Sequence, residues 1–395
     1  MSTITLQYLL DACSPGGASV LTSVTPLEPA AGPHASVAPA KFVSGSKSVF
    51  AYERRFWNGE AATAVLIDSK QSQNNRLEAA VSAAIADEDP VLTRTPRIEL
   101  RFEDGQVYND MDLPHRAFDG QIRAGTINGE PATAVQKYRE LRDSTVAHAR
   151  PLLQRSPMTL LLGGWDASRK SHQGRYRSIL VGEIIGILAD QDGGPEANQS
   201  KRGGARIDPV GMRIDLGDKA RKAIADAQKH ELSASTHKSA SGKTGKASTL
   251  GLGGVPPSLE QLGGVTCQAI IRSHVLSFAA LRALRFDSPT PEGDVACRAL
   301  LAALALNGLA RSDAELLLRA NCDLVETGPA VVTLDRRYGQ KESFEPLSID
   351  QAQELLSVAI DNATQTANLT WDGSVLVVEG NPAILAAAAD DAQDD

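Results

Sequence analysis

The stretch that most constrains the fold of this chain runs from residue 64 to residue 86, where a short apolar run, a polar run and a helix-like pattern follow one another. Ala62 to Ile67 is short and apolar, which predicts a buried strand. From Leu77 onward the apolar residues fall three and four positions apart, which predicts one face of a helix that ends before Pro90. The mixed order of strands and helices along the chain, together with its long polar insertions, favours an α+β fold.

Between the predicted strand and helix we expect a polar turn, Asp68 to Leu77, rich in amide, hydroxyl and cationic side chains. Such side chains, beside the free N–H groups of a helix start, suit phosphate oxygens, ribose hydroxyls and base edges. A solvated, well-capped turn has the same composition, so the residues alone leave both interpretations open. The candidate nucleic-acid contacts are Ser69, Lys70, Gln71, Ser72, Gln73, Asn74, Asn75 and Arg76.

A second polar and cationic segment follows the apolar run Met158 to Leu162, which we expect to be a strand. It could line a phosphodiester backbone while Trp165 or Tyr176 stacks on a base or ribose. The alternative is a solvated basic hairpin with Trp165 in the core. The candidate contacts here are Trp165, Ser168, Arg169, Lys170 and Arg175.

His115 and Arg116 follow Pro114 at the start of a helix-like segment and could also reach RNA. A histidine that only packs or caps at a helix start is the alternative. Asp119 could bind a metal ion, but no second carboxylate or histidine stands beside it at ligand spacing.

Further patterns predict the rest of the architecture. Asn58-Gly59 predicts a hairpin turn, and His274 lies on an apolar stripe where a packed core histidine is expected. The predicted strands are 98–102, 179–188, 207–216, 331–334 and 375–378. The predicted helices are a long helix from Pro131, a helix with an apolar stripe over 267–284, an Ala/Leu helix over 295–309, and a helix that begins at the capping box 348–351.

Charge is distributed unevenly along the 395 residues. The chain carries a net charge of −8, yet residues 165–246 hold 15 Lys or Arg against 10 Asp or Glu. This local excess favours a confined phosphate track. Residues 190–254 are therefore expected to be flexible basic insertions, with Lys238, Lys243 and Lys246 as further RNA contacts. An acidic, disordered tail is expected at 386–395, after a single elaborated domain over 1–385.

The four cysteines are widely spaced and predict neither a zinc site nor a disulfide framework. The sequence has no run of eighteen apolar residues, and its N-terminus lacks the basic start of a signal peptide. We therefore expect a soluble, cytoplasmic protein that does not enter a membrane.

Five segments together resemble the CRISPR-associated RAMP proteins of type I-G (formerly I-U) systems, which are Cas-seven-type backbone subunits. The first segment, residues 68–78, reads DSKQSQNNRLE. The others follow in the order expected for the family, and together they cover about residues 60 to 330. They are residues 115–119, 164–168, 251–257 and 281–286.

The resemblance implies an RRM-like (ferredoxin-like) RAMP palm with inserted finger, thumb and helical elements. It implies a non-catalytic subunit that polymerises along the guide RNA (crRNA) and presents it for pairing with target DNA in antiviral defence. The implied partners are crRNA, the target DNA strand, further copies of the protein, the large and Cas-five/Cas-six-type subunits of Cascade, and a recruited helicase-nuclease. No cofactor or metal is implied, and 229–250 is the implied candidate thumb.

Two other functions compete with this one. A metal-dependent endoribonuclease of the RAMP class would use Asp68 or Asp119 as its acid, but the histidines are scattered and no paired acids stand on a loop. An acidic scaffold that binds no nucleic acid would account for the net negative charge.

Overall fold

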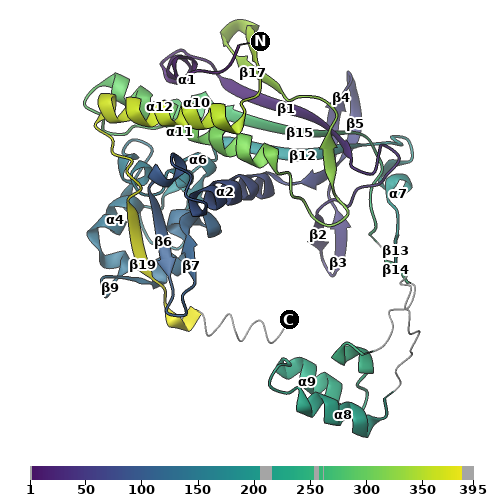
Figure 1. The fold of residues 1–395 in the computed structure, drawn as a ribbon. Coiled ribbons are helices and arrows are strands. Elements are labelled where there is room, and N and C mark those ends of the chain that lie inside the picture. Colours follow the sequence, from purple (N-terminus) through teal and green to yellow (C-terminus); the bar gives the residue numbers. More distant parts are fainter. Residues whose placement is uncertain (1, 205–215, 253–257, 261, 385–395) are drawn as a thin grey trace. The chain divides into compact units, whose positions relative to one another are not determined.

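The computed structural model describes residues 2–204, 216–252, 258–260 and 262–384 (Figure 1). Contacts divide the chain into two compact units, which we call the main unit (1–199 with 264–380) and the small unit (200–263 with 381–395). The small unit contains most of the segment predicted to be an insertion. The predicted tail, residues 207–215 of the predicted strand pair, and residues 253–257 of the fourth family-like segment lie outside the described residues.

The main unit is built on an antiparallel sheet with the strand order β18-β17-β1-β15-β12-β5-β4, in which β16 also pairs with β1. The α+β prediction is confirmed, and so are the strands expected around 62–67, 179–188 and 331–334. The RRM-like palm with its finger and thumb stays a prediction. The strands are β1 (Val20–Pro29), β4 (Tyr52–Trp57), β5 (Glu60–Asp68), β12 (Leu180–Leu188), β15 (Cys267–Ser277), β16 (Leu324–Glu326), β17 (Val331–Asp335) and β18 (Lys341–Phe344).

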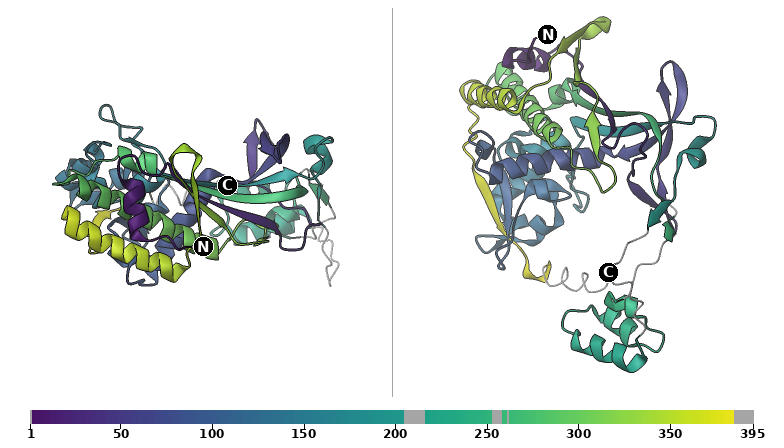
Figure 2. Two further views of the ribbon diagram at one scale, coloured as in Figure 1. Left: turned by 90° about the horizontal axis from the view of Figure 1, so that it is seen from above. Right: turned by 45° about the vertical axis from the view of Figure 1, so that its right-hand side comes forward.

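One face of this sheet is buried and the other is largely open. In β1 the side chains of Leu21 and Leu27 are buried, whereas Val24 on the opposite face is 38% exposed. Helices cover the buried face, and α11 and α12 lie side by side (Figures 1 and 2). These helices are α1 (Leu6–Cys13), α2 (Lys70–Ala86), α10 (Phe278–Ala283), α11 (Pro291–Ala314) and α12 (Ile349–Ala367).

Helix α11 forms the centre of the core. Among the described residues it is long and apolar enough to cross a membrane by length and composition, but 89% of its apolar window is buried inside the protein. Such burial is typical of a core helix. The predicted Ala/Leu helix is thus confirmed, as is the capping box at Ser348 that begins α12.

A second sheet with the order β7-β6-β19-β8-β9 completes the main unit, and its strands β6 and β19 run parallel. Short helices and two hairpins, β2–β3 and β10–β11, fill the connections. The bounds are β2 (Lys41–Ser44), β3 (Lys47–Phe50), β6 (Arg97–Arg101), β7 (Val107–Asn109), β8 (Thr126–Ile127), β9 (Glu130–Pro131), β10 (Gly164–Trp165), β11 (Arg175–Tyr176), β19 (Val375–Glu379), α3 (Gly120–Ala124), α4 (Gln136–Asp143), α5 (Arg150–Leu153), α6 (Pro157–Leu162), α7 (Gly194–Asn198), and the 3-10 helices η1 (Leu92–Arg94), η2 (Asp110–Asp112), η3 (Arg116–Phe118), η4 (Ala132–Ala134) and η6 (Arg337–Gly339).

The small unit contains helices within the segment where we expected flexible basic insertions. Arg221 is buried, and its guanidinium donates to the backbone carbonyls of Ala240 (2.8 Å) and Gly242 (2.6 Å). These bonds join two helices that share too few apolar residues to signal a core in the sequence. The elements are α8 (Asp218–Ala227), α9 (Ala234–Ser241), the 3-10 helix η5 (Ala247–Leu250), β13 (Arg202–Gly204) and β14 (Ser258–Glu260).

Three predicted elements of the main unit are wrong in type. Residues 158–162 form helix α6, because Pro157 suits a first helical turn and an apolar run this short does not distinguish helix from strand. The stripe over 267–277 is strand β15, whose buried alternate positions include Arg272 and His274, so polar residues hide its period of two. The long helix from Pro131 is instead β9, η4 and the short α4.

His274 is the packed core histidine that we predicted. It is 5% exposed, and burial together with the Arg272 cation lowers its pKa to about 3. Its partner on the next strand is Gly182, where a Cβ atom would lie 2.0 Å from the imidazole. The ring therefore occupies the space that a side chain would fill at that position.

Candidate nucleic-acid interface

Helix α2 begins at Lys70, seven residues earlier than we predicted. Ser69 is its N-cap, and the Ser69 hydroxyl accepts a hydrogen bond from the Ser72 amide at 3.2 Å. A serine cap followed by lysine, glutamine and arginine is compatible with a helix start, although the segment lacks apolar residues. The expected turn is therefore two turns of helix, and helical geometry divides its polar side chains into two sets.

One set faces the protein interior and surrounds Asp68. The Asp68 carboxylate is fully buried and accepts hydrogen bonds from Gln73 (2.6 Å), Arg76 (3.1 Å) and Arg319 (2.7 Å). Burial alone would raise the pKa of Asp68, but the hydrogen bonds from Arg76 and Gln73 outweigh it and hold this pKa below its usual range. The Ser72 hydroxyl acts in the same direction. Gln73 and Arg76 are thus bonded inside the protein.

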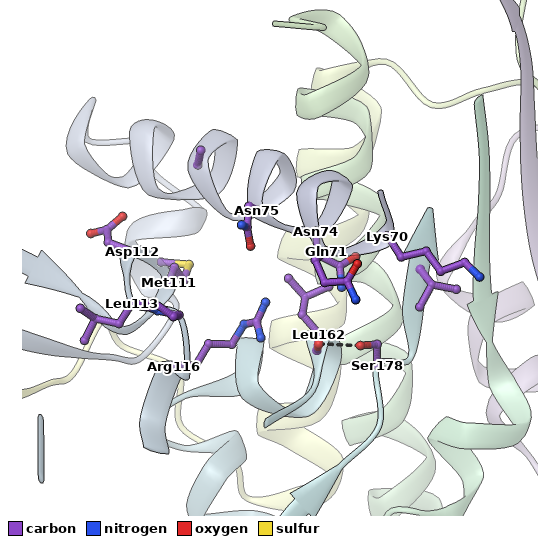
Figure 3. A pocket seen from close by; sticks show the side chains of 13 residues that line it. Lys70, Gln71, Asn74, Asn75, Met111, Asp112, Leu113, Arg116, Leu162 and Ser178 are labelled. Carbon is purple, nitrogen blue, oxygen red and sulfur yellow. Dashed lines mark hydrogen bonds between the residues drawn. The ribbon is translucent and has the colours of Figure 1, made fainter. Parts of the chain in front are cut away.

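The other set lines a groove with a volume of 720 Å³. Lys70, Gln71, Asn74 and Asn75 project from α2 into the groove, and Arg116 and Ser178 lie across from them (Figure 3). Among the described residues, the side-chain amides of Gln71, Asn74 and Asn75 have no hydrogen-bond partner. The groove lining also includes Ala79, Met111, Asp112, Leu113, Pro114, Leu162 and Val181.

Arg116 ties two walls of the groove together. Its guanidinium pairs with Glu78 of α2, at 2.7 Å for the Nη2 contact, and donates to the Gly163 carbonyl at 3.0 Å. Arg116 has a φ of 48°, a backbone conformation uncommon for residues other than glycine. Burial raises the pKa of the Glu78 carboxyl to about 7, although the Arg116 cation opposes that rise.

The groove is polar rather than strongly basic. Lys70 lies 3.7 Å from Glu183, and Asp112 is a second acidic group nearby. The first-turn N–H groups of α2 add partial positive charge at the same end. The arrangement therefore suits hydrogen bonds to ribose and phosphate oxygens more than simple charge neutralisation.

The β10–β11 hairpin carries the second predicted group of contacts. Trp165 is 48% exposed, which excludes a core position, and the Arg175 guanidinium carbon lies 4.5 Å from the centre of its ring. Arg169 donates to the Arg142 carbonyl at 2.8 Å and pairs with Asp143, so it braces the loop. Ser168 and Lys170 are exposed in the same loop.

The remaining predicted contacts lie outside the groove. The His115 side chain is exposed and is not part of the groove lining. Asp119 caps α3, where its carboxylate accepts from the Gln121 amide at 2.8 Å. Lys238, Lys243 and Lys246 are exposed in the small unit.

Several groove residues had no signal in the sequence. Met111, Leu113 and Leu162 are apolar and belong to segments that show no binding pattern. Arg319 reaches Asp68 from 251 positions away along the chain, which no local pattern could reveal. Ser178 directly follows the basic run that ends at Arg177, so that run was the one available hint.

Within the described ranges, no three His, Cys, Asp or Glu side chains come together at a spacing that could hold a metal ion. No curated protein matches the chain. Residues 21–191, however, match the family described as CRISPR-associated protein GSU0053. The matched segment contains every residue that lines the groove. The comparison therefore supports a CRISPR-associated protein with a role in CRISPR defence.

Proposed function

We propose that this protein is a non-catalytic backbone subunit of a type I CRISPR interference complex, of the type I-G kind, and that it binds crRNA in the groove beside α2. The observation that carries this proposal is the set of groove-lining amides at Gln71, Asn74 and Asn75, which have no hydrogen-bond partner among the described residues and lie beside Lys70 and the helix N-terminus. Amide groups fixed on a rigid helix can bond to phosphate and ribose without reading the base.

The family match supports the proposal, since it covers the whole groove and belongs to a CRISPR-associated family. In the proposed complex, further copies bind along the crRNA, which pairs with the target DNA strand. The large subunit, the Cas-five/Cas-six-type subunit and a recruited helicase-nuclease complete the set of proposed partners.

The competing nuclease has less support. Asp68 is surrounded by Arg76, Arg319 and Gln73, and Asp119 caps a helix. Each of the two candidate acids is thus engaged in an internal structural contact, and a catalytic metal would need both a free carboxylate and further ligands beside it.

The double variant Lys70→Ala/Gln71→Ala tests the proposal. Its matched control is Gln340→Ala/Lys341→Ala, which removes the same two residue types from exposed positions at β18, on the opposite edge of the sheet from β4 and β5. Fluorescence anisotropy with a labelled crRNA would measure the dissociation constant between low and moderate salt.

The groove variant should bind about tenfold more weakly or worse, and the slope of log K against log salt should fall by about 0.7, the value for one lost phosphate contact on a single strand. The control should match the wild type, and scrambling the spacer sequence should change neither result. Equal losses in the two variants would place the RNA elsewhere, and no RNA retention by the wild type would refute the proposed function.

A further inference from the structure

The Trp165–Arg175 pair on the β10–β11 hairpin is separate from the amides of the groove. These two residues face each other across the hairpin, and the Arg175 guanidinium covers the indole. Nearly half of the Trp165 surface is nevertheless exposed, at 48%. Exposing the apolar indole of a tryptophan to water is unfavourable, even when a cation lies against one face of the ring. Packing within the protein therefore does not account for this position.

The hairpin beneath this pair is held rigidly. Asp166, next to Trp165, is buried and pairs with Arg142 at 2.7 Å, and its amide bonds to the Gly174 carbonyl at 3.0 Å. On the opposite face Tyr176 stacks on Phe118, with ring centroids 6.2 Å apart and planes 14° apart.

Gly164 allows the hairpin to approach this close, because a Cβ atom there would lie 2.8 Å from Thr159 and 3.0 Å from Phe118. The indole is therefore presented outward from a fixed support, and its exposure does not arise from a loose loop.

The hairpin also adjoins the groove. Arg116, which lines the groove, donates to the carbonyl of Gly163, the residue directly before β10. Leu162 and Ser178 line the groove at the two ends of the hairpin segment, and the Ser178 hydroxyl donates to the Leu162 carbonyl at 2.7 Å. The hairpin that carries Trp165 and Arg175 thus borders the groove through Leu162, Gly163 and Ser178.

We infer that Trp165 and Arg175 form a stacking site for one unpaired nucleobase of a single-stranded nucleic acid. Every base has an aromatic face, so an indole binds bases with little regard to sequence. Arg175 holds the ring in place and adds a stacking guanidinium plane. The inference rests on the proposed function, which places the nucleic-acid strand in the groove. It adds a second kind of contact, in which a base stacks on the Trp165 ring.

The test uses the full-length protein and a labelled single-stranded RNA that carries 2-aminopurine at successive positions. At one register the wild type should quench the 2-aminopurine emission, and Trp165→Ala should abolish that quenching. Trp165→Ala should also weaken binding roughly 5- to 150-fold, the range for one stacked base, without changing the salt slope. Trp165→Phe should restore most of the affinity, and Trp165→Ala should melt like the wild type because its side chain is exposed.

A DNA strand of the same sequence, labelled in the same way, shows whether the base that stacks on Trp165 belongs to RNA or to DNA. Quenching with RNA alone assigns the site to the guide strand, and quenching with both shows that it accepts either strand. Absence of quenching at every register, or equal affinity for Trp165→Ala and the wild type, overturns the inference while leaving the salt-dependent groove intact. If Trp165→Ala does not fold, Arg175→Ala replaces it, and unchanged quenching together with unchanged affinity in Arg175→Ala would overturn the stacking site.

Discussion

Replacing Arg76 by alanine should destabilise the protein, although Arg76 lies in the segment that we predicted as a candidate RNA contact. Its guanidinium bonds to Asp68, a carboxylate with no solvent exposure. Removing one partner of a buried ion pair costs about 3–5 kcal/mol, because the remaining charge stays buried.

The structure places the expected loss below that range. Arg319 and Gln73 still bond to Asp68 in the variant, and the Arg76 side chain is itself 24% exposed. We therefore expect a loss of ~2–3 kcal/mol. For a unit of this size that corresponds to a fall in Tm of ~3–5 °C.

The assay is thermal melting of Arg76→Ala, with Lys70→Ala as the matched control from the same helical turn. The Lys70 side chain is 57% exposed, so its loss should leave Tm almost unchanged. Adding Asp68→Asn to Arg76→Ala should recover part of the loss, because the double variant no longer buries the unpaired charge. If Arg76→Ala melts within about 1 °C of Lys70→Ala, the Asp68 cluster does not stabilise the fold and the reasoning fails.

Two further predictions concern the core and the groove. Gly182→Ala should lower the free energy of unfolding by about 1–3 kcal/mol, because the new methyl group would lie 2.0 Å from the His274 ring. Gly217→Ala is the control and should melt like the wild type, because no atom lies within 4 Å of its new methyl group. Equal melting temperatures for the two variants would contradict this packing. The raised pKa of Glu78, about 7 against an ordinary 4.5, means that the folded state binds more protons than the unfolded state between these values. The free energy of unfolding should therefore fall as pH rises from about 4.5 to 7. In melting curves recorded across that range, Glu78→Gln should show a weaker dependence on pH. An unchanged slope in Glu78→Gln would show that Glu78 titrates normally.

The strongest sequence patterns predicted their elements correctly. The apolar run before Asp68, the strand over 179–188, the Ala/Leu helix and the Ser348 capping box are all present. In each case the signal was local, since a continuous apolar run or a cap depends on neighbouring residues only.

The sequence patterns predicted the wrong element where the fold buries polar or charged side chains. Strand β15 buries Arg272 and His274, which broke its alternation, and Arg272 is stabilised there by Asp313 and Glu326 from other segments. In the small unit, Arg221 replaces the apolar contacts that would have signalled a core. Partners distant in sequence make these polar residues acceptable inside the fold.

The amino-acid sequence by itself singled out the polar run after β5 as a candidate binding segment, and its composition is compatible with contacts to sugar-phosphate oxygens. Only the tertiary structure decided which of those side chains line the groove. Because the run is helical, Gln73 and Arg76 turn inward to Asp68 while Lys70, Gln71, Asn74 and Asn75 face a groove. That division depends on Arg319 and on the opposite wall, which the chain brings in from segments that no local pattern connects.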